Sequence, residues 1–220
     1  MERIEKLKDK ETATAYLEWD RRWKTEEGRN NWLDPEPEVI AVTRRLRNRG
    51  VSRVLDLGCG VGRHSILLAS LGFSVVAFDA SSNGIAFARS RAKADGIFFL
   101  IGLMSELPFG NCSFDYVLAW NVIYHGNRSI VGQSLREIRR ILKPGGFFQG
   151  TMLSKTDHRY GRGRAIEPDT YISEGEGHPH FFCNASGLAE LFAEFDLIRL
   201  VDCTNQATET NHWHFLAKRI

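Results

Sequence analysis

The 220-residue chain has few cysteines, little net charge and no long apolar run. Its four cysteines form no CxxC pair and no regular framework, which indicates free thiols in a reducing cytosol. The formal net charge of +2 is too small to indicate a nucleic-acid-binding protein. No apolar segment approaches the roughly 20 residues needed to cross a bilayer. The charged N-terminus also lacks the apolar core of a signal peptide. We therefore expect a cytoplasmic protein with no membrane partner.

Strand patterns alternate with helix patterns along most of the chain. Strands are predicted near 52–57, 74–79, 97–101, 114–121, 146–152, 196–204 and 211–218. Helices are predicted near 2–27, 36–49, 62–71, 82–95, 128–142 and 185–194. This alternation predicts an α/β fold, a Rossmann-like, mostly parallel sheet with helices on both faces. The last two strands are too close for a helical crossover, so the final strand should be antiparallel.

The length suits a single domain, 1–220, in which two segments do not fit the alternation. Residues 1–49 are predicted to form an N-terminal helical cap, with Tyr16, Trp19 and Trp23 on one helical face. Trp19, Trp23, Trp32 and Tyr124 could form an aromatic box beside a sulfonium, or the N-terminal aromatics could simply dock the helix. Docking is preferred for Trp19 and Trp23, while both interpretations stay open for Trp32. Residues 153–183 are glycine-rich and polar, and we expect a substrate-side insertion that acts as a lid.

A glycine-rich turn follows the first strand. It contains Gly58, Gly60 and Gly62, but position 63 is Arg, so the dinucleotide fingerprint GxGxxG is not complete. Asp56 precedes the turn, which favours a zwitterionic ligand over a pyrophosphate. Asp79 closes the second strand, where an acid can accept hydrogen bonds from both ribose hydroxyls of a nucleoside.

Four segments in order and spacing resemble the class I S-adenosylmethionine-dependent methyltransferases, of the methyltransferase type 11-like kind. They are VLDLGCGVGRHS, VVAFDAS, LPFGNCSFDYVLAWNVIYH and LKPGGFF, and the resemblance covers roughly residues 50–152. The segment GCGVGRHSILLASLGFSV is most similar to the small-molecule branch that includes the tellurite-resistance and thiopurine-type enzymes. The resemblance implies a seven-stranded sheet with an antiparallel last strand, and S-adenosyl-L-methionine as the cofactor.

The resemblance also implies a set of cofactor contacts. The methionine moiety would lie at Asp56, Gly58 and Gly60, and the ribose at Asp79. The complete predicted set is Asp56, Gly58, Cys59, Gly60, Gly62, Asp79, Ala80, Met104 and Asn121. Leu103 stands where many members carry an acid that binds the adenine amino group. Adenine would then depend on backbone near Met104 and on apolar contacts, with Ser105 or Glu106 as possible substitutes.

The methyl acceptor is expected beyond the fourth strand, at the switch point of the sheet. Tyr124 and His125 follow this strand and are the predicted catalytic residues. His125 could accept a proton near neutral pH, or it could simply pack against the following helix. The predicted substrate residues are Trp32, Arg159, Arg162 and Arg164, the arginines because guanidinium groups bind carboxylates and phosphates.

No metal site is predicted from the sequence. His178, His180 and Cys183 provide three donors within six residues, but no fourth ligand is evident. His212 and His214 share one face of the last strand and are expected to be structural.

The predicted function is methyl transfer to a small molecule by in-line displacement, which needs no base when the acceptor is a thiolate or another soft anion. One alternative is an RNA or protein methyltransferase, for which 44–53 and 159–164 supply some basic charge. An NPPY-type tetrad is absent, however, and the overall charge is nearly neutral. The other alternative is a non-catalytic module with this fold. The sequence leaves the acceptor atom and the oligomeric state open.

Overall fold

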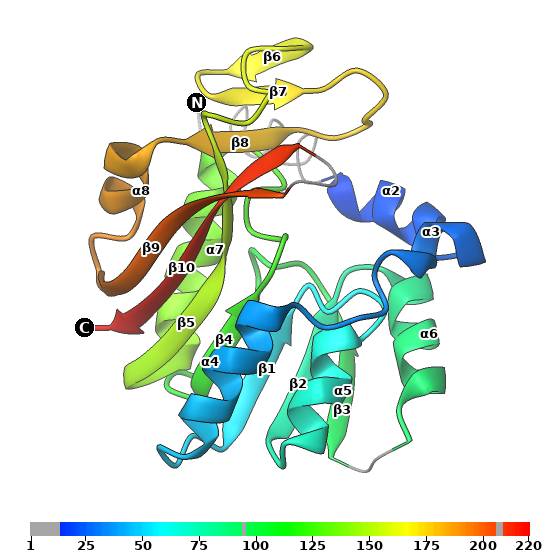
Figure 1. Ribbon diagram of the computed structural model, residues 1–220, viewed down its shortest axis with the longest axis vertical. Coiled ribbons are helices and arrows are strands. Elements are labelled where there is room, and N and C mark those ends of the chain that lie inside the picture. The colour runs from blue at the N-terminus through cyan, green and yellow to red at the C-terminus, as the bar shows by residue number, and fades with distance from the viewer. Residues whose placement is uncertain (1–13, 94–95, 206–208) are drawn as a thin grey trace.

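A single sheet carries most of the fold (Figure 1). The computed structural model describes residues 14–93, 96–205 and 209–220. Seven strands follow the order β3-β2-β1-β4-β5-β10-β9. Their bounds are Arg53–Leu57 (β1), Ser74–Asp79 (β2), Ile97–Ile101 (β3), Phe114–Ala119 (β4), Leu142–Ser154 (β5), Phe195–Asn205 (β9) and Thr210–Arg219 (β10). Strand β10 is antiparallel to both β5 and β9, and the pairs from β3 to β5 are parallel. The predicted Rossmann-like sheet with an antiparallel last strand is confirmed.

Helices cover both faces of this sheet, as predicted. Those bearing on the core are α4 (Pro37–Arg47), α5 (Arg63–Ser70), α6 (Ser82–Arg91), α7 (Arg128–Ile141) and α8 (Ala185–Leu191). Successive strand residues point to opposite faces. Val54 accordingly packs in a cluster with residues of α4 and α5, whereas the next residue, Leu55, packs in a cluster with residues of α7 and α8. Within the described residues, no helix is both long and apolar enough to span a membrane.

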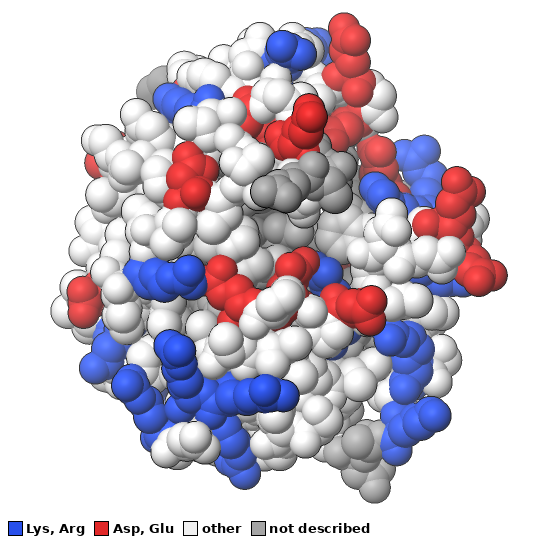
Figure 2. All heavy atoms as spheres, in the orientation of Figure 1, with Lys and Arg blue, Asp and Glu red and all other residues white. Residues whose placement is uncertain are grey.

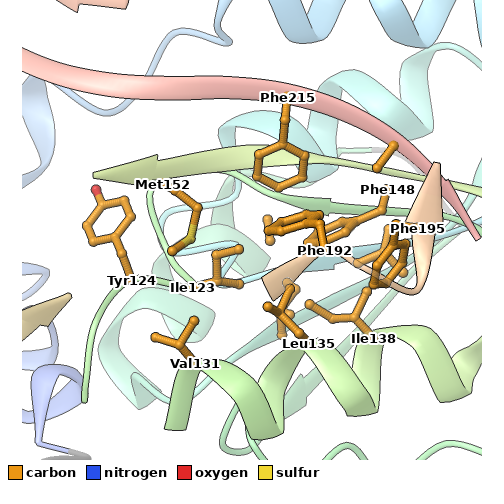
Figure 3. Packing of buried hydrophobic residues seen from close by; sticks show 14 of the residues in the cluster. Ile123, Tyr124, Val131, Leu135, Ile138, Phe148, Met152, Phe192, Phe195 and Phe215 are labelled. Carbon is orange, nitrogen blue, oxygen red and sulfur yellow. The ribbon is translucent and has the colours of Figure 1, made fainter. Parts of the chain in front are cut away.

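The larger core cluster contains a group of phenylalanines between α7 and the hairpin formed by β9 and β10 (Figure 3). Phe148 stacks on Phe192 with ring centroids 5.8 Å apart, and Phe215 meets Phe148 edge to face at 4.9 Å. Such aromatic contacts stabilise a core beyond the area that they bury. The hairpin is therefore fixed to the sheet, and β5 is held in the position from which it leads into the insertion.

The N-terminal segment differs from the single helix predicted over 2–27. The structure has two short helices, α2 (Ala15–Arg22) and α3 (Glu26–Asn30), and the predicted residues before 14 lie outside the described residues. The chain leaves the helical path before Thr25, whose extended backbone and side chain cap α3 by accepting a hydrogen bond from Gly28 N. Helix α2 is fastened to the start of α6, because Asp20 accepts hydrogen bonds from Ser81 Oγ and from Asn83 N and Nδ2.

The predicted insertion, 153–183, contains regular secondary structure. It contains β6 (Arg164–Glu167), β7 (Thr170–Ile172) and β8 (His180–Cys183), which pair as an antiparallel meander. Strand β8 is buried and pairs with the end of β5 in parallel. The insertion is therefore joined to the main sheet through β8, which pairs with the end of β5 beyond β4.

Candidate active site

A pocket lies where the carboxyl ends of β1, β2, β3 and β4 meet α2. It holds about 970 Å³ of space free of atoms, including the open solvent at its mouth. Its walls come from five segments. These are Ala15–Trp23 with Trp32, Leu57–His64, Phe78–Ala80, Gly102–Ser105 and Trp120–Ile130, each contributing some of its residues. Parallel strands deliver their last residues to the same edge of the sheet, which is why these distant segments converge.

The glycine turn and Asp79 form one hydrogen-bonded unit. Gly58 and Gly60 have positive φ angles of 68° and 50°, which a residue with a β-carbon rarely adopts. Gly60 N donates to Asp79 Oδ2 and Ser81 N donates to Asp79 Oδ1, both at 2.7 Å. Burial raises the pKa of the Asp79 carboxyl above its ordinary value, while the backbone donors oppose that rise. Asp79 therefore holds the turn in place and also lines the pocket.

Two residues of the predicted cofactor set do not reach the pocket wall. Asp56 is only 2% exposed and accepts a 2.5 Å hydrogen bond from Ser65 Oγ. Burial raises its pKa to about 6. Gly62 begins α5, with a positive φ of 81°, and a β-carbon there would meet the Ala88 side chain at 2.7 Å. Both residues support the turn from below, so their predicted direct contacts with the cofactor are not supported by the structure.

Three tryptophans form an aromatic wall on the N-terminal side of the pocket. Trp19 stacks on Trp23 with centroids 5.0 Å apart, and Trp32 meets both edge to face. Among the described residues, Trp19 Nε1 and Trp32 Nε1 are buried without a hydrogen-bond partner. Trp23 lies over the turn, since a β-carbon at Gly60 would meet its ring at 3.2 Å. The tryptophans therefore dock α2 and line the pocket at once, so the two interpretations of the sequence do not exclude each other.

The wall after β3 is the one expected to face adenine. Leu103, Met104 and Ser105 line the pocket here, together with Ala80 directly after β2, while Glu106 is not part of the wall. Leu103 keeps 40% of its surface exposed. Apolar side chains and backbone therefore dominate this wall, and of the two predicted substitutes for the missing acid only Ser105 is in place.

The end of β4 contributes Asn121 and His125 to the wall. Asn121 has a positive φ of 59° and is held by Thr151, whose Oγ1 accepts from Asn121 N and donates to Asn121 Oδ1. Tyr124 is not part of the pocket wall, and its hydroxyl lies 3.3 Å from His212 Nε2. Burial, together with nearby His180 and His178, lowers the pKa of His125 well below its ordinary value, and burial raises the pKa of Tyr124.

The three predicted substrate arginines do not line the pocket. Arg162 and Arg164 are exposed on the insertion. Arg159 is half-buried and engaged by Asp157, with contacts of 2.9 Å and 3.1 Å, and by Glu176 at 3.6 Å. Its guanidinium therefore binds acidic residues of the insertion itself. The composition of the segment predicted anion binding at the pocket, but none of the three arginines is part of the pocket wall.

The sequence analysis missed several pocket residues, among them Arg63, His64 and Trp120. Arg63 and His64 come from the first turn of α5, and Trp120 comes directly after β4. Arg63 pairs with Glu36 at 3.0 Å, and its guanidinium lies over the Trp32 ring. Their position immediately after a glycine turn or a strand end is the signal that could have identified them.

Comparisons with known proteins agree with this architecture. Residues 54–146 match the family model described as "Methyltransferase domain". An uncharacterized methyltransferase of Synechocystis is 34% identical over 106 residues, 47% of this chain and 49% of that protein. A demethylmenaquinone methyltransferase of Clavibacter sepedonicus is 38% identical over 110 residues, 49% of this chain and 43% of that protein.

Among solved structures, the 1,6-didemethyltoxoflavin-N1-methyltransferase of Burkholderia thailandensis, with 1,6-didemethyltoxoflavin and S-adenosylhomocysteine bound, is similar in fold. The TM-score is 0.71 at 23% identity, and the match covers 94% of this chain and 88% of that one. The match to each of the two curated relatives spans about half the length of that relative. Residues 54–146 therefore match a methyltransferase-domain family, and the strand order is the one typical of class I S-adenosylmethionine-dependent methyltransferases.

Proposed function

We propose that this protein transfers a methyl group from S-adenosylmethionine to a small-molecule acceptor by in-line displacement. The observation that carries the proposal is the pocket in which the glycine turn and Asp79 meet Asn121 and the tryptophan wall. In open α/β sheets the ligand lies at this edge of the sheet. The methyl donor and the acceptor would share the pocket, since in-line transfer requires them to be held together.

The cofactor side is assigned from the turn outward. Each oxygen of Asp79 accepts one backbone hydrogen bond and keeps a lone pair for a ribose hydroxyl. Adenine would lie along the apolar wall at Leu103 and Met104. The methionine ammonium and the sulfonium would lie near Gly58 and Gly60. The carboxylates of Asp56 and Asp79 are close to this turn, and their negative charges favour a cationic ligand.

The acceptor side is assigned to the tryptophan wall and the end of β4. Aromatic faces attract a sulfonium, and the unpaired N–H groups of Trp19 and Trp32 are suited to an oxygen of the acceptor or to the cofactor carboxylate. Of the predicted catalytic residues, His125 would contact the acceptor, while Tyr124 would position His125 from behind, with ring centroids 4.6 Å apart.

The charge of the surface and the names of the relatives also favour a small acceptor. On the face shown in Figure 2, basic side chains gather toward the lower edge and acidic ones lie across the middle, so this face carries both signs. The names of the two characterized relatives, a demethylmenaquinone and a 1,6-didemethyltoxoflavin methyltransferase, are those of small-molecule enzymes. The narrower tellurite-resistance or thiopurine-type branch remains part of this proposal.

The test is a methyl-transfer screen against thiols, metalloid oxyanions, small carboxylates and RNA, measured as S-adenosylhomocysteine release. It is combined with calorimetry of S-adenosylhomocysteine binding to Asp79→Ala and to the control Asp196→Ala, an exposed acid outside the pocket. Loss of the ribose hydrogen bonds, about 2–3 kcal/mol, should weaken binding by Asp79→Ala about 30- to 150-fold, and the control should match the wild type.

Each alternative function has its own outcome in this screen. Turnover with RNA alone would replace the small acceptor with a macromolecular one. Tight binding without turnover on any acceptor would favour the non-catalytic module. Undiminished affinity in Asp79→Ala would remove the ribose assignment.

A further inference from the structure

Three histidines from two distant segments meet in the interior beside the pocket. His125, His178 and His180 are 8%, 4% and 3% exposed, and one ring nitrogen from each lies within 4.8 Å of the others. Backbone pairing sets this arrangement, since Phe181 N donates to Tyr124 O and Gly126 N donates to Pro179 O. In an extended segment, residues two apart point the same way, so His178 and His180 both face His125.

The outer nitrogen of each ring faces an oxygen that can only accept a hydrogen bond. His125 Nε2 lies 3.2 Å from Asn121 O, and His178 Nδ1 lies 3.4 Å from Glu18 Oε2. His180 Nδ1 lies 3.1 Å from Glu176 Oε2, within hydrogen-bond distance although not aligned as one. Metal-bound histidines usually donate their second N–H to a carboxylate or a carbonyl in this way. The outer contacts therefore assign the protons to the outer nitrogens.

The inner nitrogens are then left with lone pairs, and one donor nitrogen of each histidine lies within 4.8 Å of the other two. His125 Nδ1 and His178 Nε2 are 3.2 Å apart. Two nitrogens that share a tetrahedral metal at 2.0–2.1 Å are expected about 3.3 Å apart. A single proton between two of the rings would satisfy two lone pairs and leave the third, whereas a divalent cation satisfies all three. The carboxylates of Glu18 and Glu176 would balance its charge.

We propose that His125, His178 and His180 bind a divalent transition metal of the zinc class, with an open coordination position toward the pocket. Imidazole ligands suit this class of metal, and three protein ligands with an open position are the composition of catalytic zinc sites. His125 joins the two regions, because it belongs to the cluster and also lines the pocket.

The use of this metal rests on the proposed function. The open position would bind the thiol or hydroxyl of the acceptor and promote loss of its proton to solvent. The bond between the acceptor atom and the methyl carbon then forms as the bond between that carbon and the sulfonium sulfur breaks, and S-adenosylhomocysteine leaves. Metal binding itself does not depend on this step.

The experiment titrates Co²⁺ into tag-free, chelator-treated protein, followed by visible absorption and calorimetry, with Zn²⁺ as the competitor. The variants are His178→Gln with His180→Gln in one chain, Glu18→Gln, and the control His158→Gln, an exposed histidine outside the cluster. We expect one Co²⁺ per wild-type chain, with the intense bands of low coordination number, and displacement by Zn²⁺. The double variant should bind Co²⁺ at least 100-fold more weakly than the wild type, and Glu18→Gln about 10- to 100-fold more weakly. The control should bind Co²⁺ with the affinity of the wild type.

Equal Co²⁺ affinity in the double variant and the control, or no binding by the wild type, would overturn the proposal. Circular dichroism and S-adenosylhomocysteine affinity of each variant check that the fold is intact. If the double variant does not fold, Glu18→Gln and the His125→Gln variant decide the outcome by the same titration. A wild type that binds Co²⁺ but not S-adenosylhomocysteine would refute the proposed function and leave the metal site standing.

Discussion

Asp56 should make the protein less stable at neutral pH than a neutral residue of the same shape would. Its carboxyl is buried, and burial raises its pKa from 3.8 to about 6. The folded state therefore binds a proton more tightly than the unfolded state, and stability falls as pH rises from about 4 to 6 and stays low above that range. The difference between 3.8 and about 6 corresponds to about 3 kcal/mol.

The substitution Asp56→Asn removes this charge and keeps an oxygen that can accept from Ser65 Oγ. At pH 8 we expect the free energy of unfolding to increase by up to about 3 kcal/mol, or the melting temperature by about 5–10 °C. At pH 4 the gain should fall below about 1 kcal/mol. Urea denaturation of the wild type and of Asp56→Asn at pH 4 and pH 8 measures the change in the free energy of unfolding. The control is Asp196→Asn, which changes an exposed acid and should leave stability the same at both pH values. A gain that is equal at both pH values, or a loss at pH 8, would refute the reasoning. A buried Asp56 carboxylate that lowers the free energy of unfolding is suited to electrostatic attraction of a cationic ligand in the adjacent pocket.

Three further predictions concern the walls of the pocket and the insertion. Gly60→Val should lower both the melting temperature and the S-adenosylhomocysteine affinity measured by calorimetry. The new side chain would collide with the Trp23 ring, and the backbone at this position has a positive φ that valine rarely adopts. An affinity equal to that of the wild type would contradict this. Asp20→Ala removes the hydrogen bonds that fasten α2 to α6, so limited proteolysis should cut the N-terminal segment faster, and an unchanged rate would refute the fastening role. The double change Arg162→Ala and Arg164→Ala should leave the Michaelis constant of the acceptor unchanged, since both side chains are exposed away from the pocket; a rise of tenfold or more would restore the sequence-based assignment.

The main sheet could be predicted because its signals are local. Each of the strands from β1 to β4 is an apolar run followed by a turn, and the short link between β9 and β10 requires a hairpin. Strands β6 to β8 have only three or four residues each, too few to show a period. They are anchored through β8, which pairs with the end of β5, a residue pairing that no local pattern contains. The break between α2 and α3 was missed because the cap at Thr25 outweighs the helical composition around it.

The candidate site could be predicted where a residue follows directly from a strand end. Asp79 and Asn121 fall in the pocket wall for that reason. Asp56 is one residue earlier in its strand than Leu57, which does reach the wall, and so it points under the turn to Ser65. The histidine cluster could not be predicted, because it requires residues 124–126 to pair with 179–181. Spacing along the sequence places His178 and His180 close to Cys183 as possible metal donors. In the structure the Cys183 thiol instead donates a hydrogen bond to the backbone carbonyl of Leu153.

A crystal structure of the protein with S-adenosylhomocysteine tests the central claim most directly. The account predicts the ribose hydroxyls on Asp79, adenine along Leu103 and Met104, and the sulfur directed toward the space between Trp19 and His125. Density for the ligand elsewhere on the molecule, or a ribose that does not contact Asp79, would contradict the assignment of this pocket to the methyl donor.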